Sequence, residues 1–327
     1  MEHILNEKEL DIQMPILGRA LYLKSKSKNH GWFVENYTII AYYIDIKLGF
    51  RRLVFATSVI CQKNQLSKLD ELEFLNKLII YIRKNNICDF IYKAQGNVVF
   101  NVCPKGAECV DWGTYEVSLN KSEEELFASF NGKSRNVIRK AKKENVIVKQ
   151  TDDVDLIYKN IKEMFDRQNS FHYPSYDYIE SLKNNLPNNA VFFIAIKDSI
   201  VQGSLILLYD ETIGYAMYAG SIIAPISGSL DLLHFEAMKF LQKKKVSLYD
   251  FVGTRIDIKP GSKQEGIDRF KKKFNPTLKQ GYAFKVIINP FKHKIFEILV
   301  KIYFRVKGYN YTESINQIEQ DKLLINK

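Results

Sequence analysis

Two neighbouring stretches in the second half of the chain, SLYDFVGT at residues 247–254 and DRFKKKFN at residues 268–275, decide how the sequence is interpreted. The first is an apolar run that predicts a buried strand. The second sets four cations around Phe270 and Phe274, which lie one helical turn apart. A solvated turn needs charge but not the two rings, and a core helix needs the rings but not the charge. The mixture predicts a structured edge whose lysines are held in place, with a basic loop and two packing rings as the alternative.

The totals leave room for two domains and favour an anionic partner. The chain has 327 residues, of which 46% are hydrophobic, so substantial cores can form. Lys and Arg total 48 against 37 Asp and Glu, which gives a formal net charge of +11. This surplus favours nucleic acid, phosphorylated lipid or an anionic membrane face. An ordinary solvated basic surface is the alternative, and composition alone does not decide between them.

The cysteines predict neither a metal site nor a disulfide framework. Cys61, Cys88, Cys103 and Cys109 contain no CxxC pair, and histidines are few. Free thiols in a reducing compartment are therefore expected. The N-terminal segment lacks an apolar signal core, and no apolar run is long enough to span a bilayer. These features predict a cytoplasmic protein, with peripheral contact at the membrane surface as a further option.

The predicted elements indicate an α/β (α+β) protein with mixed sheets flanked by helices. In the second half, two helices precede a three-strand meander over residues 190–221, whose turns fall at Asp198-Ser199 and Asp210-Glu211. A helix, a strand, the basic segment and a further strand follow. Earlier in the chain, Ser122 and Glu125 form a capping box that opens a helix.

The expected division of the chain has three parts. A change of rhythm near residues 145–152 suggests a boundary there, although no linker rich in Pro or Gly marks it. The expected parts are an N-terminal domain, a C-terminal domain, and a basic amphipathic helix with its tail, over residues 1–148, 149–292 and 293–327.

A basic helix is predicted over residues 133–143. Arg135, Arg139 and Lys142 fall on one face of it, because they are spaced by three or four residues. Such a face can bind phosphates. The alternative is a solvated charged surface. His172 lies between two predicted helices and could line a cleft or be structural, whereas His234 is expected in a core. No Ser-His-Asp order, HExxH, Walker loop or GxGxxG motif occurs.

Three segments resemble the Fem-type peptidoglycan-bridge aminoacyltransferases. They are YEVSLNKSEEELFASFNGKSRNVIRKAKKENVIVK at residues 115–149, YAMYAGS with LLHFEAMKFLQKKK at residues 215–245, and LYDFVGT with GIDRFKKKFN at residues 248–275. The resemblance covers about residues 110–292. It implies two tandem GNAT-like acyltransferase domains. It also implies transfer of an amino acid from aminoacyl-tRNA to an amine of a lipid-linked or nucleotide-linked cell-wall precursor, as in a lipid II:glycine glycyltransferase, or of another surface glycan.

The resemblance assigns the donor side of the reaction to the basic segment. Lys271 would be catalytic by polarising the ester carbonyl of the donor and stabilising its oxyanion. Arg269, Phe270 and Lys272 would bind the acceptor end of the tRNA. The chain departs from the family pattern at Lys273, where family members usually have glycine.

The resemblance assigns the acceptor side to other segments. Tyr218 matches a tyrosine near the acceptor pocket and is a second catalytic candidate. Tyr176 and His172 lie where the family places groups for the phosphates of the precursor, although this sequence has no Arg there. Lys28 is similar to a phosphate-binding lysine of the first domain.

No cofactor is expected beyond the aminoacyl-tRNA donor. The rival enzyme is a CoA-dependent GNAT N-acyltransferase that acts on an amino sugar in surface-polysaccharide synthesis. Such enzymes bind pyrophosphate through free amides of a glycine-rich loop at a helix start. The equivalent stretch here, IIAPISGSLDLL at residues 222–233, contains Pro225 and a single glycine, Gly228. This loop argues against acetyl-CoA.

The closing segment predicts a basic amphipathic helix that begins near Asn289-Pro290. Its apolar stripe and neighbouring cations could rest on the inner, anionic face of a membrane. The alternative is a helix that packs on its own domain.

Overall fold

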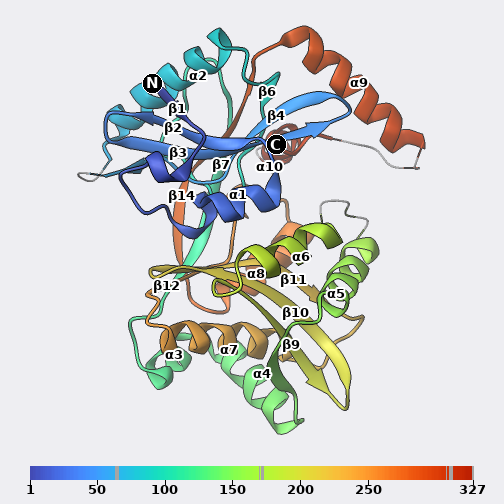
Figure 1. The fold of residues 1–327 in the computed structure, drawn as a ribbon. Coiled ribbons are helices and arrows are strands. Elements are labelled where there is room, and N and C mark those ends of the chain that lie inside the picture. The colour runs from blue at the N-terminus through green and yellow to red at the C-terminus, as the bar shows by residue number, and fades with distance from the viewer. Residues whose placement is uncertain (63–65, 169, 171–172, 307, 309–311, 326–327) are drawn as a thin grey trace. The chain divides into compact units, whose positions relative to one another are not determined.

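A computed structural model describes the chain except for residues 63–65, 169, 171–172, 307, 309–311 and 326–327 (Figure 1). The chain forms two compact units. Unit 1 comprises Met1–Thr114, Gly253–Gly266 and Lys279–Lys327, and unit 2 comprises Tyr115–Val252 and Ile267–Leu278. Each unit is a mixed sheet flanked by helices, which confirms the predicted α/β (α+β) class.

The boundaries of the two units differ from the expected domain boundaries at residues 148 and 292. Strand β7 (Glu108–Ser118) gives its first residues to unit 1 and its last to unit 2. The chain then returns to unit 1 twice, through residues 253–266 and 279–327. Unit 1 is therefore assembled from segments far apart in the sequence, which a search for a single boundary does not reveal.

Unit 1 is built on a sheet in which neighbouring strands are antiparallel, except for the parallel pair β4 and β6. Its strands, in spatial order, are β1 (Glu2–Ile4), β2 (His30–Glu35), β3 (Thr38–Lys47), β4 (Phe50–Phe55), β6 (Phe90–Ile91) and β14 (Thr277–Ile287). Two short strands lie off this path: β5 (Ile60–Cys61) pairs with β3, and β13 (Thr254–Arg255) pairs with β7.

All but one of the described helical segments of unit 1 bury apolar side chains, the exception being the first 3₁₀ turn. These segments are the 3₁₀ turns η1 (Glu7–Glu9) and η2 (Ile16–Gly18), with α1 (Ala20–Lys26), α2 (Lys68–Lys84), α9 (Pro290–Val306) and α10 (Ser314–Ile325). Leu75, Leu78 and Ile82 of α2 pack with Phe55 and Phe284 of the sheet in a fully buried core. Among the described residues, no helix is long and apolar enough to cross a membrane.

Unit 2 contains the predicted meander. Its strands follow the end of β7 in the order β12 (Leu248–Asp250), β11 (Ile213–Ser221), β10 (Ile200–Tyr209), β9 (Ala190–Lys197) and β8 (Ile147–Thr151). Only the pair β11 and β12 is parallel in this series. Asp198 and Ser199 both adopt positive φ, at 48° and 64°, which is the geometry of a tight hairpin turn between β9 and β10. The predicted turn is confirmed.

Helices cover both faces of the second sheet (Figure 1). They are α3 (Glu123–Ser129), α4 (Gly132–Lys143), α5 (Val154–Arg167), α6 (Tyr176–Asn185), α7 (Ser229–Lys243) and α8 (Lys263–Lys272), whose residues from Ile267 onward belong to unit 2. The predicted capping box of Ser122 and Glu125 opens α3. On one face, Leu126, Ile138 and Leu233 of α3, α4 and α7 share a buried core with the sheet.

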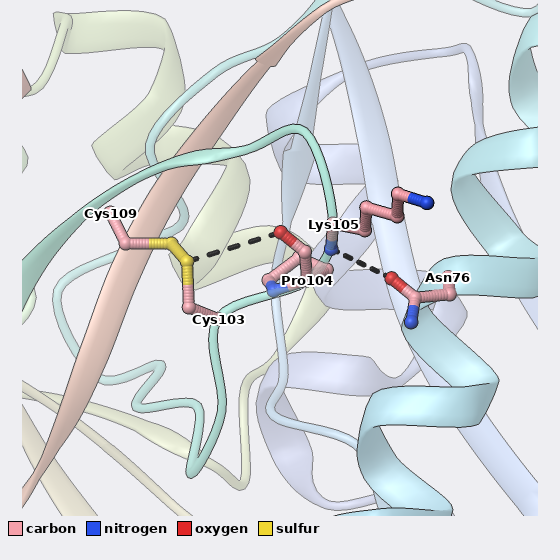
Figure 2. Close-up of a disulfide and its surroundings, with 5 residues drawn as sticks. All are labelled: Asn76, Cys103, Pro104, Lys105 and Cys109. Carbon is pink, nitrogen blue, oxygen red and sulfur yellow. Dashed lines mark hydrogen bonds between the residues drawn. A yellow bond between two sulfur atoms is a disulfide. The ribbon is translucent and has the colours of Figure 1, made fainter.

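The expectation of four free thiols is wrong for two of them. Cys103 and Cys109 form a disulfide with a Cα–Cα distance of 6.1 Å, while Cys61 and Cys88 are free (Figure 2). A turn between the two cysteines, in which the Ala107 amide donates to the Pro104 carbonyl at 3.2 Å, brings them within reach. The Lys105 amide also donates to Oδ1 of Asn76 on α2 at 2.8 Å. Spacing rules based on CxxC do not register a pair that is six residues apart.

Candidate functional site

The two phenylalanines of the basic segment fix the end of α8. Phe274 is fully buried and its ring centroid lies 5.1 Å from that of Phe130 and 5.2 Å from that of Phe251. The ring of Phe270 lies 5.6 Å from Phe274 and packs against the same core. Anchoring both rings holds the intervening lysines in defined positions, as the sequence predicts.

Lys271 is a buried lysine. The residue is 8% exposed, and its Nζ donates a hydrogen bond to the carbonyl of Val252 at 3.4 Å. Burial lowers the pKa of Lys271 to about 8, and the nearby carboxylates of Asp250 and Asp268 oppose this shift. Lysine is seldom buried, because removing its charge from water costs free energy. Lys271 lies in α8, and its Nζ reaches the chain just after the buried strand β12. A lysine with a perturbed pKa in such a place marks a candidate site.

Two buried carboxylates surround this lysine. Asp250, 2% exposed at the end of β12, accepts a hydrogen bond from the amide of Val252 at 2.6 Å. Asp268 accepts a hydrogen bond from the hydroxyl of Tyr115 at 2.7 Å and pairs with Lys272 at 2.8 Å. Burial, and then Asp268, raises the pKa of Tyr115. The site therefore holds its negative charge in fixed positions next to a cation.

His234 is a core residue, as expected, and it borders the site. Its Nδ1 lies 2.5 Å from the hydroxyl of Tyr249, and its ring centroid lies 5.3 Å from that of Phe270. Burial, and then the charge of Lys271, lowers the pKa of His234 to about 3. The imidazole is therefore neutral at physiological pH, and burial also keeps the Tyr249 hydroxyl protonated by raising its pKa well above 10.

The other cations of the segment have different environments. Arg269 and Lys272 are exposed, and Lys272 is held by its ion pair with Asp268. Lys273 pairs instead with Asp231 of α7 at 3.1 Å, and the same carboxylate accepts a hydrogen bond from the hydroxyl of Ser134 at 3.1 Å. Asp231 is 4% exposed. This network ties together α4, α7 and the end of α8.

Sequence reasoning missed Asp231 as a partner. The available signals were a carboxylate in the first turn of α7 and the unusual Lys273 after the two preceding lysines. Neither signal shows that the two residues meet, because they are 42 positions apart.

The start of α7 is closely packed. Gly228 adopts a φ of 88°, and a Cβ atom there would lie 2.0 Å from the carbonyl oxygen of Val137 on α4. The amide of Ser229 donates to the carbonyl of Ile226 at 3.0 Å. Glycine is required here by both the conformation and the close approach of α4. The Ser229 amide at this helix start thus faces a protein carbonyl, and Asp231 lies in the same turn.

The acceptor-side candidates lie in several places. Tyr218 is a half-buried residue of β11 whose ring lies 6.2 Å from that of Tyr178. Burial raises the pKa of Tyr218 to about 12, so its hydroxyl keeps its proton at neutral pH. Tyr176 opens α6 and its ring lies 5.7 Å from that of Tyr158. Lys28 is exposed in unit 1, and His172 lies outside the described residues.

The basic face of α4 is present, but two of its cations contact their own unit. The guanidinium of Arg139 lies 5.2 Å from the ring centroid of Phe127. The Nζ of Lys142 lies 5.3 Å from the ring centroid of Phe235 and 3.6 Å from a carboxylate oxygen of Glu236. Arg135 is half-buried. Binding of phosphate by this face stays a prediction. In the part of the chain that the structure describes, no His, Cys, Asp and Glu side chains gather in a group that could hold a metal ion.

The fold is shared with solved structures. No protein-family model matches the sequence, and no curated protein matches it either. The crystal structure of FemX superposes with a TM-score of 0.63 at 14% identity, covering 91% of this chain and 100% of that one.

The chain has the fold of FemX. This confirms the Fem-type fold that the three sequence segments predict.

The same fold relates the chain, at lower TM-scores, to two further structures. One is the C-terminal domain of a protein assigned as a lysylphosphatidylglycerol synthetase from Agrobacterium fabrum, with a TM-score of 0.51 and 11% identity. The other is L-PGS from Bacillus licheniformis, with a TM-score of 0.51 and 14% identity. Each comparison covers 83% of this chain and 88% of the other. At these identities the likeness to FemX and to both proteins concerns the fold.

Proposed function

We propose that the protein is an aminoacyltransferase that moves an amino acid from aminoacyl-tRNA to an amine of a peptidoglycan precursor or another cell-surface glycan. The observation that carries the proposal is Lys271, a buried cation of α8 whose Nζ contacts the Val252 carbonyl just after β12, within a Fem-type fold. Its position in the sequence matches the motif that the Fem-type resemblance assigns to the donor carbonyl. The reaction is placed in the cytoplasm, where aminoacyl-tRNA is available, with an acceptor that is nucleotide-linked or carried on the inner face of the membrane.

The chemistry needs one well-placed cation. The neutral amine of the acceptor attacks the ester carbonyl, and negative charge develops on the carbonyl oxygen. A fixed ammonium group such as that of Lys271 stabilises this oxyanion, an effect that fixed charges exert strongly in a buried site. Collapse forms the C–N amide bond and breaks the C–O ester bond. The amine gives up a proton, and the departing hydroxyl of the tRNA gains one. Tyr218, whose hydroxyl stays protonated, is the second catalytic candidate as a hydrogen-bond donor.

The surroundings of α7 support a tRNA donor over acetyl-CoA. Pyrophosphate binds at a helix start through free amides and the positive end of the helix dipole. In this chain, Gly228 is pressed against Val137 and the Ser229 amide already donates to Ile226. Asp231 places a carboxylate in the first turn of the same helix. An incoming pyrophosphate would meet close packing at Gly228 and a Ser229 amide that is already used.

The acceptor is the open part of the proposal. The fold is shared with a protein assigned as a lysylphosphatidylglycerol synthetase, so a lipid headgroup belongs among the acceptors to be tried. The test offers the purified protein a mixture of labelled aminoacyl-tRNAs and, separately, labelled acetyl-CoA. Cell-wall precursors, amino-sugar nucleotides and phosphatidylglycerol are supplied one at a time. Label that moves from tRNA into an amide of a cell-wall precursor or amino sugar supports the proposal. Transfer to phosphatidylglycerol alone, which has no amine and would form an ester, or transfer from acetyl-CoA alone, contradicts it.

The pKa of Lys271 predicts how the rate depends on pH. The ammonium form is the stabilising one, so transfer is expected to fall as pH rises through about 8. In Lys271→Arg the side chain stays charged, so any residual activity should lose this alkaline decline. The measurement is the initial transfer rate against pH, corrected for spontaneous ester hydrolysis without enzyme. A rate that keeps rising above pH 8 in the wild-type protein would argue that Lys271 acts as a neutral amine.

A further inference from the structure

Helix α9 presents an apolar face outward from unit 1. Its inner face, formed by His293, Phe296, Val300 and Phe304, is buried, and Phe296 packs against Phe50 and Phe90 of the sheet. On this inner side, α9 therefore packs on its own unit, which is the alternative that the sequence left open. An ordinary surface helix then exposes polar residues on its other side.

The outer side of α9 does not follow that rule. Five large apolar residues are strongly exposed on it, with exposed fractions from 40% to 83%: Phe291, Ile298, Leu299, Ile302 and Val306. Their spacing of three, four or seven residues keeps most of them on one outward face, opposite Phe296 and Val300. Clusters of exposed apolar side chains of this kind mark contact sites with proteins or membranes.

The charges beside this face select the partner. Lys294, Lys301 and Arg305 are exposed and line one flank of the apolar residues. Glu297 is the one acidic residue of the helix, and it lies toward the inner side, only half exposed. Lys292 lies on the other side and pairs with Asp89 at 2.9 Å. Aliphatic side chains bordered by cations suit lipid tails bordered by anionic headgroups.

We infer that the outer face of α9 docks on the surface of an anionic phospholipid bilayer. The apolar residues enter the boundary between headgroups and acyl chains, and the flanking cations contact the headgroups. In Figure 1, α9 is the orange-red helix along an edge of unit 1. This inference does not depend on the proposed function, although a docked enzyme would be close to a lipid-linked acceptor.

The test is co-sedimentation of the full-length protein with vesicles. Vesicles of phosphatidylcholine alone are compared with vesicles that also contain phosphatidylglycerol, at low and high salt. The wild-type protein is expected to sediment with the anionic vesicles, and high salt should weaken this binding. In the double variant Ile298→Asp/Ile302→Asp, the affinity for anionic vesicles should fall by about tenfold or more. Replacing Lys294, Lys301 and Arg305 by glutamine should remove the preference for anionic vesicles.

A matched control uses two exposed apolar residues elsewhere in unit 1. Leu69 and Ile80 of α2 are 77% and 63% exposed, so Leu69→Asp/Ile80→Asp carries the same change of charge. This variant should bind vesicles like the wild type. Failure of the wild-type protein to bind anionic vesicles, or equal loss in both double variants, would overturn the inference. A stable dimer that dissociates in Ile298→Asp/Ile302→Asp, measured by light scattering, would assign the face to a second copy and also overturn it.

Discussion

Lys271→Met is expected to reduce transfer by about 100- to 1,000-fold, because the variant lacks the cation that stabilises the oxyanion. The same change should make the protein more stable at neutral pH. Burial lowers the pKa of Lys271 from 10.5 to about 8, so the folded state binds its proton less tightly than the unfolded state does. Each unit of such a shift corresponds to about 1.4 kcal/mol, and we expect a gain of about 1–3 kcal/mol in the free energy of unfolding.

The sign of this stability effect can be tested with pH. The unfolded lysine binds a proton up to about pH 10.5, whereas the folded one loses it near 8. Wild-type stability should therefore rise between these values, and the advantage of Lys271→Met should shrink over the same range. Asp250 and Asp268 oppose the lowering of the Lys271 pKa, so their attraction to the ammonium is already included in the expected gain.

Lys272→Met is the matched control for both measurements. Lys272 is the next residue along the chain, but its side chain is 59% exposed and its partner is Asp268. Its replacement should change stability little, because exposed ion pairs contribute at most about 1 kcal/mol. If tRNA binding involves Lys272, its loss should weaken binding without abolishing the chemical step. Unfolding in urea and single-turnover transfer rates measure both effects. Full activity in Lys271→Met would contradict the assignment.

Asp231→Leu is expected to lower the free energy of unfolding by about 2–4 kcal/mol. The variant removes the partner of Lys273 and the acceptor of the Ser134 hydrogen bond, while the side chain of Lys273 is only 21% exposed. A cation left without its partner in such a place is costly. Urea or thermal unfolding of unit 2, followed by circular dichroism, measures the loss.

Two companion variants make this second prediction specific. Asp166→Leu breaks an exposed ion pair with Lys162 in the same unit and should cost less than about 1 kcal/mol. Lys273→Met added to Asp231→Leu replaces the whole pair by apolar groups and should recover most of the lost stability. A double variant as unstable as Asp231→Leu would show that the ion pair is not the source of the effect.

Much of the fold could be predicted from the sequence because local signals and the core agree. The capping box at Ser122, the tight turn at Asp198-Ser199 and the ring pair Phe270 and Phe274 each have a local physical cause. Each also fits the sheet or core around it. Consistency between local preference and tertiary packing is what makes such predictions succeed.

Most of the features that could not be predicted depend on contacts between residues that are far apart in the sequence. The pairing of Lys273 with Asp231 and the contact of Gly228 with Val137 arise from how helices pack, and spacing along the sequence carries no trace of them. The Cys103–Cys109 disulfide was missed because rules for redox and metal motifs favour shorter spacings. Unit limits were missed because distant segments complete unit 1.

The candidate site shows the same division. The importance of Lys271 followed from its motif, but its burial came from tertiary packing. Burial lowers the pKa of Lys271, and the carboxylates of Asp250 and Asp268 oppose this shift. The basic helix over residues 133–143 was correctly predicted as α4, yet the sequence did not reveal that Arg139 and Lys142 lie on aromatic rings.

The central claim is that Lys271 serves transfer from aminoacyl-tRNA. The most direct measurement follows labelled amino acid leaving tRNA in the presence of a cell-wall precursor extract, with wild type, Lys271→Met and Lys272→Met compared at equal concentration. The account predicts that wild type and Lys272→Met move label into an alkali-stable amide product, while Lys271→Met does not. Equal transfer by Lys271→Met, or transfer by the wild type from acetyl-CoA but never from tRNA, would contradict it.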